Sequence, residues 1–337
     1  MKERAFYLDA VKGIAILCIT FLHFEEGVIP QWANIWIGLF MISTFYFTSG
    51  WVSGMQNKKI TPKELFKKRI KQLGIPYLWF SAIIIIFDIM WVFLGFMDIQ
   101  ILARDIYKTI TLRGIGTLWF LPVLFIGEMI FCTIRNCKQK REMAVAGVIL
   151  TLIVSYLYYD IWGKYYNLSV VNKLIDAPIQ PIAKGIISWP IIAIGYIFTK
   201  YVWNRTKKLQ PYYNMLIGIV LLLLSIIMVV NPPFNIFYIN GLLCNILPSI
   251  AFILIFAVIG YNNIISRFFI FWGVNSLILM CTHFSIFLEI FKVVDAKIIH
   301  SNFCGYTTII YFILTIIFTY PLVALFNGKL RFIIGKN

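Results

Sequence analysis

Long apolar stretches, each about as long as a membrane-spanning helix, follow one another along almost the whole chain. A helix needs about 20 mainly apolar residues to cross the hydrocarbon core of a bilayer. Ten stretches of about this length lie at residues 10–28, 34–54, 76–96, 117–134, 143–160, 179–199, 212–231, 240–261, 268–290 and 306–326. The pattern predicts an all-α, polytopic membrane protein with about ten transmembrane helices and leaves no room for a separate soluble domain.

The connections between these stretches alternate between many and few basic residues. The dense connections include the runs from Lys58 to Lys71 and from Arg135 to Arg141, and with the two chain ends they hold most of the 30 lysines and arginines. Because connections rich in Lys and Arg stay on the cytoplasmic side of a membrane, both termini are expected to be cytoplasmic.

The composition excludes a soluble protein and limits the kinds of molecule that the chain is expected to bind. The chain is 61% hydrophobic and only 13% charged, which is too little charge for a water-exposed surface. A net charge of +16 would suggest nucleic acid for a soluble chain, but basic residues that flank membrane spans contact anionic headgroups. We expect membrane lipid as a partner and no nucleic acid. The six cysteines show no disulfide framework and no zinc-ligand spacing, so no metal is expected.

The first apolar stretch, YLDAVKGIAILCITFLHF, contains Asp9, Lys12 and His23. In a helix, Lys12 and His23 are separated by about three turns and about 16 Å, so they share one face, with Asp9 about 40° away. Charged groups at membrane depth usually face a bundle interior or a wet cavity, so the stripe predicts a pocket. His23 is a candidate base, because imidazole takes and returns a proton near neutral pH. Alternatively, Asp9 and Lys12 lie at the cytoplasmic interface and His23 forms a hydrogen bond to another helix.

A basic segment, PKELFKKRIKQLGIPYLW, places Arg69 and Lys71 just before Pro76. One interpretation is a helix that binds lipid headgroups at the membrane surface. A second is a clamp for a phosphorylated cosubstrate, because Arg and Lys are the usual partners of phosphate. Both interpretations can hold together.

Other polar residues also fall inside apolar stretches. Asp88 and Glu128 are intramembrane carboxylates, with Lys184 as a possible partner for either, and Trp119 lies at a predicted outer edge. The stretch WGVNSLILMCTHFSIFLEI includes His283, for which helix-to-helix hydrogen bonding is the favoured role.

These motifs together resemble the acyltransferase 3 family of bacterial membrane O-acyltransferases, and within it the branch of fucose 4-O-acetylases and capsule O-acetyltransferases. The resembling segments, in the order of the family, are YLDAVKGIAILCITFLHF, FYFTSGW, RIKQLGIPYLW, LWFLPVLF and GVNSLILMCTH. Two positions differ from the usual pattern of this branch. Ser43 and Thr44 replace a Met-Pro pair, and Lys71 stands where a second arginine is common.

The resemblance implies a single integral-membrane acyltransferase domain over residues 1–337, in the plasma membrane of a bacterium. It implies cytoplasmic acyl-CoA, usually acetyl-CoA, as cosubstrate without a resident cofactor, and a hydroxyl of a cell-surface or lipid-linked glycan as acceptor. His23 would act as general base or as transient acyl carrier, with Asp9 and Lys12 along the route of the donor. Arg69 and Lys71 would bind the CoA phosphates, and Lys12 or Trp119 would orient the donor.

Transport is the alternative function. A glycan flippase or proton-coupled transporter would use buried Asp88, Glu128, Lys184 and His283 to bind ions or relay protons. Neither an internal repeat nor matched helix breaks, both frequent in such carriers, are evident in the sequence. A structural or sensory scaffold would explain the spans but not the ionisable stripe.

Overall fold

The structure is a computed structural model of the chain and describes residues 5–56, 59–206, 208–231, 237–300 and 304–336. Within these ranges all regular structure is helical, and ten helices are long and apolar enough to cross a membrane. They run over Phe6–Phe24, Gln31–Met55, Pro62–Phe93, Gly116–Asn136, Lys140–Tyr165, Val170–Thr206, Pro211–Val230, Gly241–Ile259, Ser276–Ile299 and Tyr306–Asn327. This confirms the predicted all-α, polytopic membrane class, whereas the cytoplasmic location of both termini stays a prediction.

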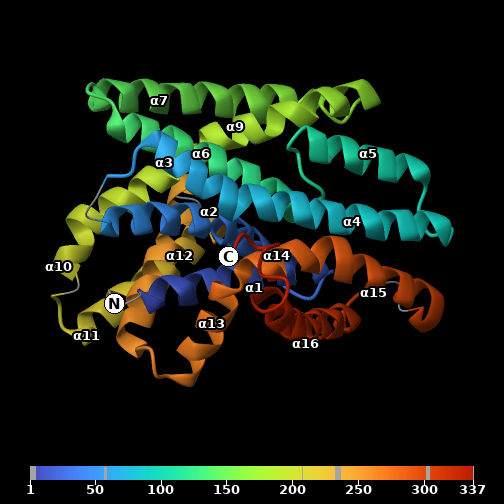
Figure 1. The fold of residues 1–337 in the computed structure, drawn as a ribbon. Helices are drawn as coiled ribbons and strands as arrows, with labels where there is room; N and C mark the ends of the chain where they lie inside the picture. The colour runs from blue at the N-terminus through green and yellow to red at the C-terminus, as the bar shows by residue number, and fades with distance from the viewer. Residues whose placement is uncertain (1–4, 57–58, 207, 232–236, 301–303, 337) are drawn as a thin grey trace. The chain divides into compact units, whose positions relative to one another are not determined.

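The described residues form two compact units, both drawn in Figure 1. Unit 1 consists of Met1–Met55 and Ile194–Val323, and unit 2 of Gln56–Ala193 and Ala324–Asn337. Two helices, α9 (Val170–Ile197) and α16 (Tyr306–Asn327), continue from one unit into the other. That the whole chain acts as one domain stays a prediction.

Unit 1 contains the two N-terminal helices and most of the C-terminal ones. They are α1 (Phe6–Phe24), α2 (Gln31–Met55), η4 (Phe198–Trp203), α10 (Asn204–Thr206), α11 (Pro211–Val230), α12 (Phe237–Ile259), α13 (Ile264–Val274), α14 (Ser276–Thr282), η5 (His283–Leu288), α15 (Glu289–Val294) and η6 (Asp295–Ile299). Unit 2 contains α3 (Pro62–Arg69), η1 (Ile70–Gly74), α4 (Ile75–Phe93), α5 (Ile99–Ile110), η2 (Gly116–Trp119), α6 (Phe120–Asn136), α7 (Lys140–Ser155), η3 (Tyr156–Trp162) and α8 (Gly163–Tyr165).

The apolar stretch predicted at 268–290 is not one helix. Asn275 separates α13 from α14, and its backbone (φ −103°, ψ 14°) leaves the helical region. Its side-chain Nδ2 donates a hydrogen bond to the carbonyl of Phe271 at 2.8 Å. A short polar side chain that bonds the local backbone competes with the helix, which explains the break and places the start of the ninth span at Ser276.

Helix α1 is held in unit 1 by close backbone contact with α13. A methyl group built on Gly13 would meet the backbone of Phe269, and one built on Gly273 would meet the backbone of Asp9. Small residues permit such close approach of helices in membranes, where apolar side chains gain little by leaving lipid. This contact fixes the helix that carries His23 (Figure 1).

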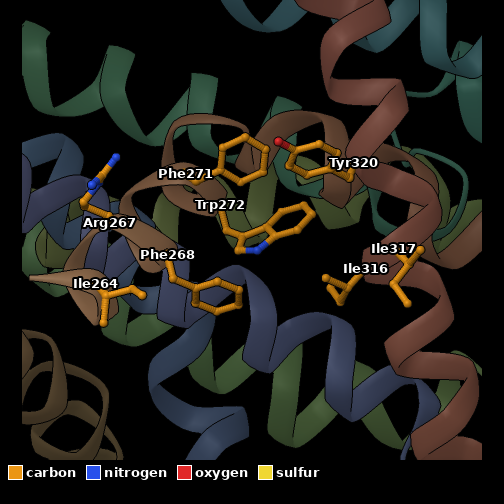
Figure 2. Close-up of a pocket in the computed structure, with 8 residues that line it drawn as sticks. All are labelled: Ile264, Arg267, Phe268, Phe271, Trp272, Ile316, Ile317 and Tyr320. Atoms are coloured by element: carbon orange, nitrogen blue, oxygen red, sulfur yellow. The ribbon is translucent and has the colours of Figure 1, made fainter.

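A groove of about 610 Å³ lies between α13 and α16 on unit 1. Figure 2 shows Phe268, Phe271 and Trp272 of α13 on one side of it and Ile316, Ile317 and Tyr320 of α16 on the other. Trp272 is buried, whereas Phe268 and Tyr320 are exposed. The groove is therefore mainly apolar, and Arg267 is the one charged residue among the described residues that line it.

In unit 2, helices α6 and α9 pack closely through glycines. A methyl group on Gly127 would meet the side chain of Ser188, and one on Gly185 would meet Ile126. Helix α7 is joined to α9 by a hydrogen bond of 2.9 Å from Trp189 Nε1 to Thr151 Oγ1. These contacts fix the membrane-spanning part of α9 against two neighbouring helices.

The third span begins earlier than predicted, at Pro62 rather than residue 76. Thr61 accepts a hydrogen bond from the Glu64 amide, and Glu64 accepts one from the Thr61 amide, so a capping box starts α3. A π-helical turn, η1, follows, in which the Ile75 amide bonds to the carbonyl of Ile70. Pro76 has no amide hydrogen and would clash with the carbonyl four residues before it, and the wider turn lets the helix continue through it.

Candidate active site

Two histidines from distant parts of the chain meet in unit 1. Nδ1 of His23, at the end of α1, lies 2.9 Å from Nε2 of His283, the first residue of η5. Their ring centroids are 5.0 Å apart. His283 is fully buried, whereas His23 is partly exposed. His23 is thus the member of the pair that a substrate can reach.

The hydrogen bonds of this pair define which nitrogens carry protons. Nδ1 of His283 lies 2.7 Å from the carbonyl oxygen of Leu279, and a carbonyl can only accept, so this nitrogen is the donor. In a neutral imidazole the other nitrogen is then an acceptor. Nε2 of His283 therefore accepts from Nδ1 of His23, and when the His23 ring is also neutral its Nε2 is the nitrogen without a proton. An unprotonated ring nitrogen is what a general base requires.

Aromatic side chains surround the histidine pair. Phe284 packs edge-on against His23, with 4.9 Å between ring centroids. The next residue of α1, Phe24, is fully buried in a cluster with Leu288, Phe291 and Tyr311. This packing anchors the last turn of α1 and so limits the movement of the His23 ring.

The loop after His23 is closed by Glu25. Its Oε1 accepts hydrogen bonds from the amides of Val28 (2.6 Å) and Ile29 (3.0 Å), and its Oε2 accepts one from Asn34 Nδ2 (2.8 Å). Burial raises the pKa of Glu25, but these hydrogen bonds stabilise the carboxylate more, so the net effect lowers the pKa. Glu25 thereby fixes the connection between α1 and α2 next to the histidine pair.

The other two residues predicted on the stripe lie at the opposite end of α1. Lys12 Nζ forms an ion pair with Asp9 Oδ1 at 2.7 Å. Asp9 is buried and Lys12 partly exposed. The helical rise places Lys12 about 16 Å from His23 along the axis, so the structure joins Asp9 to Lys12 but brings neither to the imidazole.

The predicted phosphate clamp contains a carboxylate. Arg69 Nη2 donates to Glu128 Oε1 at 2.5 Å, Arg69 Nε pairs with Glu128 Oε2, and Arg69 Nη1 donates to Gln72 Oε1 at 2.6 Å. Glu128 is buried, while Arg69 and Lys71 are partly exposed. Of the five N–H groups of an arginine, three are used by these contacts, so among the described residues two remain for a ligand, and Glu128 fixes the orientation of the guanidinium.

Lys184 was a possible partner for Asp88 or Glu128, but in the structure Glu128 pairs with Arg69. Lys184 Nζ instead lies over the ring of Trp119, 4.1 Å from its centroid. Trp119 ends η2, and a tight turn precedes it, in which Gly114 (φ 74°) and Gly116 (φ 52°) have left-handed backbone. The arrangement is a cation–π contact within unit 2.

The pairing of His283 with His23 is one feature of the site that the sequence analysis missed. The favoured role of His283 was a hydrogen bond between helices. Such a bond is present, but its partner is the candidate base itself. The sequence did contain an indication that His283 belongs to the site, because GVNSLILMCTH, one of the segments that resemble the family, ends on this histidine.

The fold and the site define a polytopic membrane protein with an accessible histidine supported by a buried one. A family model described as an acyltransferase domain matches residues 6–328. The chain therefore belongs to the acyltransferase 3 family, a family of membrane acyltransferases. The fucose 4-O-acetylase and capsule branch stays a prediction. Neither the search of curated proteins nor the search of solved structures gave a match.

Proposed function

We propose that the protein is an O-acetyltransferase of a bacterial plasma membrane, which moves an acetyl group from cytoplasmic acetyl-CoA to a hydroxyl of a cell-surface or lipid-linked glycan. The observation that carries this proposal is the row of hydrogen bonds from Nδ1 of His23 through His283 to the carbonyl of Leu279, which assigns the acceptor role to Nε2 of a neutral His23. The membership of the acyltransferase 3 family supplies the reaction class.

In the proposed reaction, Nε2 of His23 takes the proton of the acceptor hydroxyl. The hydroxyl oxygen attacks the thioester carbonyl, a C–O bond forms, and the C–S bond to CoA breaks. The proton on His23 then passes to the departing thiolate, so the products are the acetyl ester and free CoA. A positioned base contributes about 10²–10⁴-fold to such a reaction. If His23 carries the acetyl group instead, its Nε2 attacks the thioester carbonyl and the C–S bond to CoA breaks. The acceptor hydroxyl then attacks the acetyl group, the N–C bond breaks, and the hydroxyl proton neutralises the CoA thiolate.

The donor is proposed to bind through its phosphates to Arg69 and Lys71 of unit 2. Glu128 compensates one positive charge there, so Lys71 and the free N–H groups of Arg69 supply the attraction. Trp119 is proposed to contact the substrates, and Asp9 and Lys12 to line the route of the donor along α1.

The test is transfer of labelled acetyl groups from acetyl-CoA by membranes that contain the wild-type chain, His23→Ala or His300→Asn, with lipid-linked and polymeric glycans as acceptors. His300 is a matched control, because it is a histidine outside the pair whose left-handed backbone (φ 57°) asparagine also adopts. We expect loss of transfer in His23→Ala alone. Substantial transfer by His23→Ala would refute the role of His23.

The consumption of acetyl-CoA also distinguishes the proposed acetyl transfer from the alternative function, transport. A glycan flippase or proton-coupled transporter would move substrate across vesicles without consuming acetyl-CoA. An acetyl label that stays on the wild-type protein when acceptor is withheld, and is absent from His23→Ala, would identify His23 as an acyl carrier rather than a base.

A further inference from the structure

One face of α9 carries polar residues at every fourth position. Asp176, Gln180, Lys184 and Ser188 are four residues apart, and this spacing aligns them along a helix. Asp176, Gln180 and Ser188 are buried and Lys184 is partly exposed. Such residues in a membrane span usually indicate a functional site, because their insertion is unfavourable.

The carboxylate of Asp176 has three polar partners within unit 2. Arg113 Nη1 pairs with its Oδ2 at 3.0 Å, while Tyr158 Oη and Trp162 Nε1 donate to its Oδ1 at 3.1 and 3.0 Å. The negative charge of Asp176 is therefore balanced by Arg113, and its hydrogen-bonding capacity is largely used.

Lys184 has no such counterion. In the part of the chain that the structure describes, no carboxylate lies within ion-pair distance of its ammonium group, and its close contact is the ring of Trp119. Asp176 attracts Lys184 from a greater distance, but Arg113 repels it. The three charges sum to one positive charge, which favours an anion near Lys184.

Gln180 provides a second, independent indication of a ligand. Its Oε1 is buried, and no donor among the described residues reaches it. A buried acceptor without a donor is unfavourable, so the site is incomplete as it stands. Gln180 lies one helical turn from Lys184, and a ligand with an anionic group and a nearby hydroxyl could contact both.

We propose that Lys184, Gln180 and Trp119 form a binding subsite for an acidic sugar. The anionic group, a carboxylate or a phosphate, binds Lys184, a hydroxyl donates to Oε1 of Gln180, and the ring of Trp119 forms an apolar wall. The binding of an acidic sugar at this subsite does not depend on the function proposed above. Only its role as the acceptor of the acetyl group rests on that function.

The test is binding to the purified, detergent-solubilised protein, followed by tryptophan fluorescence, since an anion on Lys184 changes the surroundings of Trp119. The probes are glucuronate, glucose 1-phosphate and neutral glucose. We expect saturable responses to the two acidic sugars and a much weaker one to glucose, and their ratio distinguishes a carboxylate from a phosphate ligand. Trp119→Phe should remove the signal while calorimetry still detects binding.

The variants are Lys184→Met, Gln180→Leu and, as a control, Lys164→Met, which removes an exposed lysine of α8. We expect Lys184→Met to weaken binding of the acidic sugars at least tenfold, Gln180→Leu to weaken it less, and Lys164→Met to leave it unchanged. Size-exclusion profiles like that of the wild type exclude misfolding. Wild-type protein without saturable binding, or a folded Lys184→Met variant with unchanged affinity, would overturn the proposal.

The experiments show separately whether the proposed subsite is wrong and whether the proposed acetyltransferase function is wrong. If Lys184→Met binds and acetylates acidic sugars like the wild type while His23→Ala is inactive, the subsite is wrong and the acyltransferase stands. If acidic sugars bind through Lys184 but no acetyl transfer depends on His23, the subsite stands without the reaction.

Discussion

Nδ1 of His23 lies 2.9 Å from Nε2 of His283, although the two residues are 260 positions apart in the chain. The buried histidine is itself fixed by the carbonyl of Leu279. A chain of two hydrogen bonds thus defines the tautomer of the accessible ring, in the way that an orienting group behind a catalytic histidine does in other enzymes.

The first prediction concerns His283 as a positioning residue. His283→Ala should lower acetyl transfer about tenfold or more, because the His23 ring loses the acceptor that holds Nδ1 protonated and Nε2 free. The acetyl-CoA dependence should change little, so the loss should appear in kcat rather than in KM. Initial rates over a range of acetyl-CoA concentrations measure both.

The pH profile adds a readout that a purely structural role would not change. Wild-type transfer should fall as the pH is lowered, because a proton on Nε2 of His23 removes the lone pair that accepts the hydroxyl proton. His283→Ala should shift the pH at which this fall occurs, whereas His300→Asn should not. Identical profiles for all three proteins would exclude the positioning role.

The second prediction separates the contribution of Arg69 to the stability of the fold from its proposed role in binding acetyl-CoA. Arg69→Gln removes the guanidinium that pairs with the buried carboxylate of Glu128, and removal of one partner of a buried ion pair typically costs about 3–5 kcal/mol. Arg69 is 22% exposed, so a value at or below the lower end is expected. Thermal unfolding in detergent should show the loss.

The double variant Arg69→Gln with Glu128→Gln is the control. It removes both charges, so it should regain much of the stability while its affinity for acetyl-CoA stays low. A double variant with wild-type affinity for acetyl-CoA would show that Arg69 acts only on the fold.

The third prediction tests the contact that holds α1. Gly13→Ala places a methyl group on the backbone of Phe269, which cannot move aside as a flexible side chain could. Overpacking typically costs about 1–3 kcal/mol, so a lower unfolding temperature and lower transfer are expected. Gly38→Ala in α2 is the matched control, since apart from the adjacent residues and backbone of α2 itself no atom of the described residues lies within 4 Å of the added methyl group. Equal stability of both variants would contradict the close contact.

The spans could be predicted from the sequence because their signal is local. Twenty apolar residues define a membrane helix whatever its neighbours are. The break at Asn275 was missed, since a single Asn inside an apolar stretch changes the hydropathy little and the decisive event is one side-chain hydrogen bond. A helix in the basic segment that starts at Pro62 was one of the interpretations of the sequence, but its continuation into the third span was missed, because Pro76 looked like a break and the π-helical turn that carries the helix through it has no hydropathy signal.

The candidate site could be predicted only in part, for a physical reason. Helical periodicity relates Lys12 to His23 on one helix, but no local pattern relates His23 to His283 or Arg69 to Glu128, since these pairs depend on the packing of distant helices. The same holds for Lys184, whose possible pairing with Asp88 or Glu128 the sequence left open. Its charge was recognised as unusual, but the choice between a carboxylate and the ring of Trp119 depends on tertiary contacts.

The last prediction concerns Glu25 and pH. Its carboxylate accepts hydrogen bonds from two amides and from Asn34, and its folded pKa lies below the ordinary value of 4.5. A group whose pKa is lowered by folding stabilises the folded state above its unfolded pKa, and this contribution is lost as the pH falls through the folded pKa. Glu25→Gln should therefore lower the unfolding temperature slightly at pH 7, and the difference from the wild type should shrink below pH 4.5.

The effect should be small, because Glu25 is only partly buried and solvent screens its charge. The neighbouring Glu26 is exposed, and Glu26→Gln should leave the unfolding temperature unchanged at both pH values. Because Glu25 closes the loop that begins two residues after His23, Glu25→Gln should also reduce acetyl transfer at pH 7. If transfer is unchanged while the unfolding temperature falls, the loop stabilises the fold without positioning the histidine pair.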